Sequence, residues 1–348
     1  MTSKTLNRTP ERLRILGLVL LALVLGGTTL LALASGTMSL SLGQTVGALW
    51  SPETSDGVGA ILWEVRLPRV ALAILAGAGL AVAGAGTQAV LNNPLVSPSV
   101  LGVSAGAAFG ASCAIIAGSR LQFVAGDILI ALCAFAGALC ATLIAWLVAT
   151  VRRASRETVI LAGIAVGFIF SGATIFLQYL APWQDLRAMV FWGVGSLWNA
   201  DGSRVAMVSL VLVPGAVVLL GISQKLNALA LGDETAFSAG INVRRLRLVT
   251  LGLSALISAV VVSACGAIAF VGLIAPHMAR LIFGHDNRWL VPASMLTGAL
   301  LLLGADTLAR TLFAPQELPV GVATALIGGP FFLFLLLRRR RDWWGGGS

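Results

Sequence analysis

The amino-acid sequence alternates between long apolar runs and short polar segments. A helix that spans a membrane needs about 20 mostly apolar residues, and somewhat fewer where it is broken or buried by its neighbours. The pattern predicts an all-α, polytopic membrane protein, because the strands of a membrane β-barrel would alternate polar and apolar positions. About ten runs meet the requirement for a helical span, and they cover residues 13–34, 66–86, 97–117, 122–150, 158–180, 204–222, 246–264, 267–284, 290–309 and 319–337.

Composition excludes several other classes of protein. Of the 348 residues, 58% are hydrophobic and only 11% are charged. A soluble globule could not cover its surface with so few charges, and a disordered chain would be far less apolar. The net charge of +9 does not indicate nucleic-acid binding, because the basic residues stand in short loops and at the two ends of the chain. We therefore expect a lipid bilayer around the chain, and no nucleic-acid partner.

The basic residues also predict the orientation of the spans. With ten spans both termini lie on one side, and the segments on that side hold 17 of the 23 Lys and Arg residues. Cytoplasmic loops carry this excess, so the N- and C-termini are expected inside. Residues 1–344 should form a single transmembrane domain, and residues 345–348 read as a linker-like tail. We expect the first apolar run to be retained, because from Ile15 to Ala34 it exceeds the ~7–15 residues of a signal-peptide core.

The sequence offers little enzyme chemistry. It has no G-x-x-x-x-G-K-[ST] loop, so ATP hydrolysis would have to come from a separate subunit. The stretch Gly102–Gly106 matches the serine-hydrolase pattern G-x-S-x-G, but Ser104 lies inside an expected span. Both histidines, His277 and His285, fall near the opposite end of the membrane. Small residues in such a helix usually serve close packing. We expect no catalytic residue, no metal site and no cofactor.

One acid stands deep in a late span. Asp306 lies one helical turn before Arg310, which allows an ion pair between positions i and i+4. Intramembrane acids are costly and are usually paired or functional. A structural pair is the preferred interpretation. An ion-coupled secondary transporter, in which Asp306 titrates, is the alternative.

The longest polar stretch, residues 223–247, carries signals for a short helix. Gly232-Asp233 is typical of a helix start, and Gly240 of a helix end. Ala236, Phe237 and Gly240 are expected on one small, apolar face. Such a helix could dock into a partner's groove or rest on the membrane surface, and composition does not decide between the two.

Several motifs taken together resemble the FecCD-type permeases of bacterial ABC importers, which import iron(III)–siderophores, haem or vitamin B12. The resemblance runs from about Thr37 to Arg338. The motifs that carry it, in chain order, are Arg66–Arg69, Asn93–Pro98, Leu101–Gly106, Leu231–Asp233, Phe270–Arg280, Ala305–Thr307 and Glu317–Gly321.

The resemblance implies ten helices, a permease dimer of identical or paralogous subunits, a cytoplasmic ABC ATPase dimer and a periplasmic binding protein. It implies a location in the bacterial inner membrane and ATPase coupling through Gly232, Asp233, Ala236 and Gly240. It also implies that Arg66, Arg69 and Arg310 meet acidic residues of the binding protein. A ferric siderophore ranks first as substrate, since no cluster of His or Met suggests haem ligation; haem and cobalamin remain open.

The only Tyr of the chain lies near two Trp in the outer segment after the fifth span. An interfacial aromatic belt is the preferred interpretation of this group, and a lining of the translocation path is the alternative. The residues concerned are Gln178, Tyr179, Trp183 and Trp192.

Overall fold

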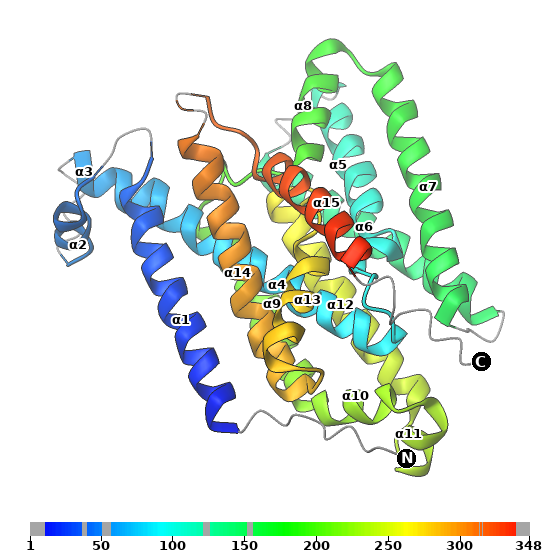
Figure 1. Cartoon of the computed structure of the whole chain (residues 1–348). Helices are drawn as coiled ribbons and strands as arrows, with labels where there is room; N and C mark the ends of the chain where they lie inside the picture. The colour runs from blue at the N-terminus through cyan, green and yellow to red at the C-terminus, as the bar shows by residue number, and fades with distance from the viewer. Residues whose placement is uncertain are drawn as a thin grey trace.

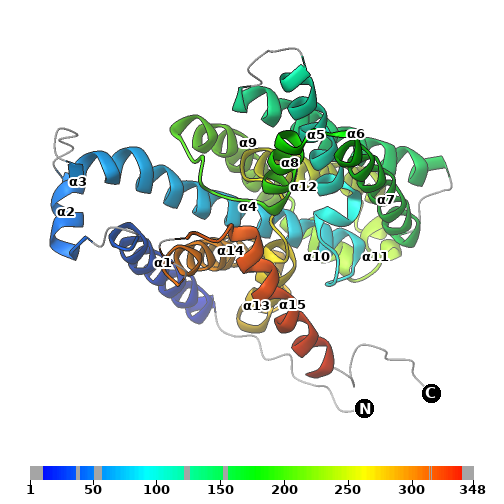
Figure 2. The ribbon, with the colours of Figure 1, turned by 90° about the horizontal axis from the view of Figure 1, so that it is seen from above.

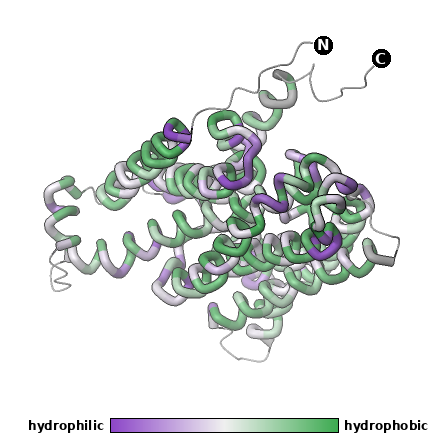
Figure 3. Tube along the Cα trace, turned by 90° about the horizontal axis from the view of Figure 1, so that it is seen from below, coloured by the Kyte–Doolittle hydropathy of each residue, from purple (hydrophilic) through white to green (hydrophobic). Residues whose placement is uncertain are grey.

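The computed structural model describes residues 11–36, 40–50, 57–120, 126–151, 156–312, 314 and 316–338. Across these residues every regular element is a helix (Figure 1). The tail 345–348, and basic residues such as Lys4, Arg152 and Arg153 that entered the orientation count, lie outside the described part. The helices are hydrophobic along most of their length, as Figure 3 shows, which agrees with the expected membrane protein.

The expected spans are present as helices. Seven helical stretches are long and apolar enough to cross a membrane, and three shorter apolar helices fill the remaining places. The long ones are α1 (Glu11–Ala34), α4 (Leu67–Leu91), α6 (Asp127–Val151), α7 (Arg156–Leu180), α9 (Gly202–Gly221), α12 (Val243–Cys265) and α14 (Asn287–Thr311). The shorter ones are α5 (Val103–Arg120), α13 (Val271–Phe283) and α15 (Val320–Arg338).

Several boundaries differ from the sequence expectation by a few residues, and two of the late starts have a cause in the backbone conformation. The span expected at 97–117 begins only at Val103, after a 3₁₀ turn, Pro98–Leu101, and Gly102, whose φ is +83°. The span expected at 267–284 begins at Val271, because Phe270 adopts a left-handed φ of +67° and cannot continue a helix backwards. Apolar composition extends past both breaks, so hydropathy alone placed these starts too early.

Several short helices lie between the spans. On one side of the membrane domain are α2 (Leu42–Trp50), α3 (Gly57–Ala60), a π-helical turn (Ile61–Arg66) that leads into α4, and α8 (Trp183–Val194). On the other side, which is also the side where α1 begins, are α10 (Ser223–Ala230) and α11 (Asp233–Ser238) (Figure 1). By the expected orientation, the first side is called outer and the second inner.

Helix α4 forms the centre of the domain. It packs against α9, α12, α13 and α14, and the views in Figures 1 and 2 show it running through the middle of the bundle. Its apolar window is 83% buried, whereas that of α1 at the edge is 6% buried. Glycines allow this closeness: a Cβ on Gly84 would collide with the carbonyl oxygen of Gly272 in α13. Small residues at such crossings are typical of membrane helices.

Candidate functional site

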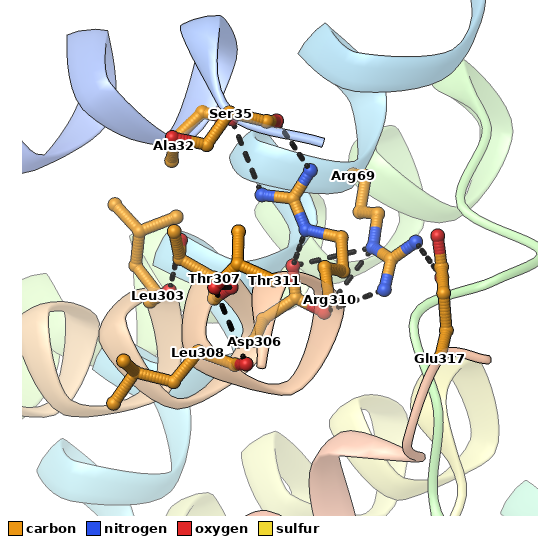
Figure 4. Close-up of polar contacts among 10 residues, drawn as sticks. All are labelled: Ala32, Ser35, Arg69, Leu303, Asp306, Thr307, Leu308, Arg310, Thr311 and Glu317. Atoms are coloured by element: carbon orange, nitrogen blue, oxygen red, sulfur yellow. Dashed lines mark hydrogen bonds and ion pairs between the residues drawn. The ribbon is translucent and has the colours of Figure 1, made fainter. Parts of the chain in front are cut away.

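Charged side chains from three separated segments meet at the outer end of the domain. The π-helical turn supplies Arg66, the first turn of α4 supplies Arg69, and the last two turns of α14 supply Asp306 and Arg310. Glu317 follows from the segment that leads to α15. We call these five residues the outer arginine cluster, and Figure 4 shows four of them.

Arg69 and Asp306 form the centre of the outer arginine cluster. Arg69 donates from Nε to both oxygens of the Asp306 carboxylate at 3.2 Å, and from Nη2 to Oδ1 at 2.9 Å. Its remaining Nη1 donates to Glu317 Oε2 at 2.7 Å (Figure 4). The planar guanidinium matches two carboxylates at once, an arrangement that lysine could not reproduce.

Arg310 binds the same carboxylate and also reaches α1. Its Nε lies 3.1 Å from Asp306 Oδ2, across one turn of α14. Its Nη2 and Nη1 donate to the carbonyl oxygens of Ala32 and Ser35 at 3.2 and 3.4 Å. The expected Asp306–Arg310 pair is therefore confirmed. The sequence pattern did not indicate that Arg69 binds the same carboxylate.

Arg66 completes the attachment of α1. Its Nη1 donates to the carbonyl oxygens of Leu33 and Ala34 at 2.6 and 3.1 Å. The last carbonyls of a helix have no partner within that helix. Arg66 and Arg310 supply these partners and so hold the outer end of α1 against α4 and α14.

The three arginines are turned inward. Arg66, Arg69 and Arg310 are only 5%, 7% and 3% exposed, although the positions lie at helix ends on the outer side. Within this chain they therefore serve first as internal bonding groups. Glu317, whose side chain is 27% exposed, is the more accessible partner of Arg69. Its place before Leu318-Pro319 repeats the charged-residue–Leu–Pro pattern of Arg66-Leu67-Pro68, a signal that could have pointed to it.

At the inner end, residues 223–247 form the two short helices α10 and α11. Helix α11 begins at Asp233, as the sequence indicated, and the Asp233 carboxylate pairs with Arg247 Nη2 of α12 at 2.7 Å. Gly240 has a φ of +76°, and the amide of Ile241 donates to the carbonyl of Ala236. This left-handed ending favours glycine and reverses the chain into α12.

The structure separates the residues expected on one docking face. Ala236 is fully buried in a cluster that includes Leu226 of α10 and Leu246 of α12, whereas Phe237 is 77% exposed. The expectation of a shared face is wrong for Ala236, because adjacent helical positions point about 100° apart. The exposed apolar surface of this segment is formed by Phe237 and Leu231, beside the exposed Gly240.

The outer aromatic residues also divide into two groups. Tyr179 and Trp183 are 84% and 76% exposed, and Gln178 is half-buried. Trp192 instead lines a cavity of about 220 Å³ between α5, α6, α8, α9 and α12, together with Phe191, Trp198, Asp127, Arg204 and Cys265. Arg204 and Asp127, both in the lining of this cavity, form an ion pair at 2.8 Å. Of the four candidate path residues, only Trp192 lines this cavity.

The G-x-S-x-G stretch has a packing role. Its last glycine, Gly106, lies against α6, where an added Cβ would collide with the carbonyl of Gly137. The small residues of this stretch thus allow α5 and α6 to approach closely.

Comparison with known proteins gives consistent matches over nearly the whole chain. The model of the FecCD transport family matches residues 18–338. The hemin transport system permease of Yersinia pestis is 40% identical over 91% of this chain and 93% of its own length. The Fe(3+)-citrate import system permease of Bacillus subtilis is 36% identical over 92% and 94%. A solved structure of a metal-chelate type ABC transporter in an inward-facing conformation is 31% identical, with a TM-score of 0.82 over 92% of this chain and 98% of that one.

Proposed function

The chain belongs to the FecCD transport family, and from that membership we propose that it carries an iron chelate inward across the membrane, with a ferric siderophore as the first candidate. It is a polytopic permease of an ABC importer, so an ATPase and a substrate-binding protein act with it. Its place is the bacterial inner membrane. We further propose that two permease subunits, identical or paralogous, enclose the path.

The match to the family over residues 18–338 is the observation that carries the proposal. Two relatives are named for iron chelates, hemin and ferric citrate, and the similar solved structure is named for a metal chelate. Within this chain the two histidines, His277 and His285, lie at the inner end, far along the sequence from the aromatic residues of the outer side. That distribution favours a complete chelate over a haem iron that the path would ligate.

The outer arginine cluster is the proposed docking site for the binding protein. Three guanidinium groups and two carboxylates meet there, so positive charge is in excess. Acidic side chains of a binding protein would be attracted to this excess. Because Arg66, Arg69 and Arg310 are buried, such a carboxylate would have to compete with Glu317 for Arg69 rather than find a free guanidinium.

The part of the inner segment from Ala230 to Asn242, which contains α11, is the proposed docking site for the ATPase. Gly232 and Asp233 stand at the start of α11, and Gly240 follows its end. The buried side chain of Ala236 packs α11 against the rest of the chain. Phe237 and Leu231 then form an exposed apolar surface that a groove of the ATPase would cover.

Transport in proteoliposomes tests the function directly. The permease is reconstituted with its cognate ATPase and binding protein. It should transport a ferric siderophore only when ATP is present on the side of the membrane that carries the ATPase. Haem and cyanocobalamin, measured in parallel, rank the substrates. Uptake that persists without ATP and follows a proton or sodium gradient would contradict the proposal and favour a secondary transporter.

Phe237→Glu tests the docking surface. A buried charge at an apolar interface is strongly unfavourable, so this variant should lose co-purification with the ATPase while its own thermal stability is unchanged. Lys225→Glu, an exposed change on α10, is the control for charge alone. Normal co-purification of the Phe237→Glu variant would refute docking through α11.

A further inference from the structure

Helix α10 lies across the inner ends of two spans. It packs against α4 and against α14, while α11, which follows it, packs against α10 and α12. Ser223, Leu226 and Leu229 form the buried side of α10. Through α10, the segment proposed to face the ATPase is therefore in contact with α14, the helix whose other end carries Asp306 and Arg310.

Asn227 makes the polar contact between α10 and α14. Its Oδ1 accepts from the backbone N–H and from the side-chain Nδ2 of Asn287, both at 2.8 Å. Its Nδ2 donates to Oδ1 of Asp286 at 2.7 Å. One side chain thus uses its amide oxygen and nitrogen on the two residues at the start of α14. We call this contact the Asn227 clasp.

The Asn227 clasp supplies a hydrogen-bond acceptor to a backbone N–H at the start of α14. The first N–H groups of a helix have no partner within it. Asp286 caps one of them by accepting from the amide of Arg288 at 3.1 Å, and Asn227 satisfies the amide of Asn287. Asn287 is only 4% exposed, so water is a poor substitute there. The position of α10 is thereby linked to the start of α14.

Helix α14 connects this contact to the outer arginine cluster. From Asn287 to Asp306 it rises by roughly 28 Å, at about 1.5 Å per residue. The same continuous helix therefore has α10 bound to one end. At its other end, Asp306 binds Arg69 and Arg310 binds α1.

We propose that Asn227 is the positioning residue through which the ATPase-facing segment and the outer arginine cluster communicate along α14. This inference rests on the proposed docking of the ATPase at residues 230–242 and of the binding protein at the outer cluster. Docking of the ATPase moves α10, and the Asn227 clasp transfers that movement to α14. Docking of the binding protein acts on the same helix from its opposite end.

The test compares ATP hydrolysis by the reconstituted complex with and without its cognate binding protein. In the Asn227→Ala variant, stimulation by the binding protein should fall by at least about fivefold, the lower range of coupling between linked sites. Basal hydrolysis and co-purification of the ATPase should stay unchanged. Gln224→Ala, which removes an exposed amide from the same helix, is the matched control and should keep full stimulation.

A second pair of variants applies if Asn227→Ala lowers the yield. Asn227→Asp places a carboxylate against Asp286 and should uncouple the complex by repulsion. Adding Asp286→Asn restores an amide donor opposite that carboxylate, so the double variant should regain stimulation. Measuring the thermal unfolding midpoint of each variant separates coupling from stability, because a purely structural contact would change stimulation only together with the midpoint.

Two results would overturn the inference. Full stimulation in both Asn227→Ala and Asn227→Asp would show that the clasp carries no coupling. Loss of ATPase co-purification in Asn227→Ala would show that the residue acts on docking and not on transmission. The Phe237→Glu variant separates the proposals: if it still binds the ATPase, the docking proposal fails first, and the inference fails with it.

Discussion

Arg69 and Asp306 form a hydrogen-bonded ion pair across 237 residues of chain, with three donor–acceptor distances of 2.9–3.2 Å. The same carboxylate lies 3.1 Å from Arg310 Nε. One acid thus pairs with two guanidinium groups that are almost completely buried. Since Arg310 also holds the end of α1, Asp306 connects three helices, α1, α4 and α14.

Asp306→Asn should therefore destabilise the permease. Removing one partner of a buried pair leaves uncompensated charge, which typically costs about 3–5 kcal/mol. We expect a clearly lower midpoint of thermal unfolding in detergent and a lower yield. Glu64→Gln, an exposed acid in the π-helical turn before α4, is the control and should unfold like the wild type.

The same variant distinguishes the structural interpretation of Asp306 from the ion-coupled one. A structural acid predicts that whatever Asp306→Asn protein folds still transports with ATP. A stable variant whose uptake loses all dependence on a proton or sodium gradient would instead assign Asp306 to a transport site for an ion.

Local and distant features of this site differ in how far the sequence reveals them. Spacing alone gave the Asp306–Arg310 pair, because residues four apart on a helix face each other. Arg69 joins them only through the packing of α4 against α14, and no local pattern encodes that packing. Likewise, hydropathy located the helical spans, but it missed the left-handed residues Gly102 and Phe270 that delay the starts of α5 and α13.

The inner segment shows a related limit. Gly232-Asp233 and Gly240 revealed the ends of α11, because start and stop signals are local. The helix is only six residues long, from Asp233 to Ser238. That is too short for its apolar period to show which side faces the protein, so Ala236 was assigned to the wrong face.

Glu317→Gln should strengthen binding-protein association if Arg69 is a docking residue. The change removes the negative charge that holds Arg69 Nη1 at 2.7 Å and leaves the Asp306 contact intact. Peripheral charges mainly affect the association rate, and salt screens them. We expect a several-fold faster association at low salt that disappears near 1 M salt. An unchanged rate at both ionic strengths would argue against docking through Arg69.

Ala236→Trp should destabilise the chain itself. Ala236 is fully buried beside Leu226 and Leu246, and overpacking a core typically costs ~1–3 kcal/mol. The matched control is Ala239→Trp, an exposed alanine one turn later. Thermal unfolding should shift only for Ala236→Trp, whereas co-purification of the ATPase should weaken for Ala239→Trp. Equal unfolding midpoints in the two variants would contradict the buried position of Ala236.

Gly84→Ala tests the closest helix crossing. An added Cβ would collide with the backbone carbonyl of Gly272, which cannot rotate away, so α4 and α13 would have to separate. Gly304→Ala in α14 meets nothing within 4 Å and is the matched control. There alanine should be neutral or stabilise by up to ~1 kcal/mol through its higher helix propensity. A thermal unfolding midpoint that falls for Gly304→Ala but not for Gly84→Ala would contradict the close contact of Gly84 with α13.

Acid stability tests the electrostatics at the start of α14. Hydrogen bonds from the Arg288 guanidinium, and then from Asn227, lower the pKa of Asp286 to about 2. In the unfolded chain the carboxyl titrates near 3.9, so the folded state favours its charged form. The resulting stabilisation is complete above about pH 4 and is lost as pH falls towards 2. We therefore expect the difference in unfolding midpoint between wild type and Asp286→Asn to be constant near pH 7 and to shrink between pH 4 and pH 2. A difference that stays constant over that interval would show that the Asp286 charge contributes nothing to the stability of the folded chain.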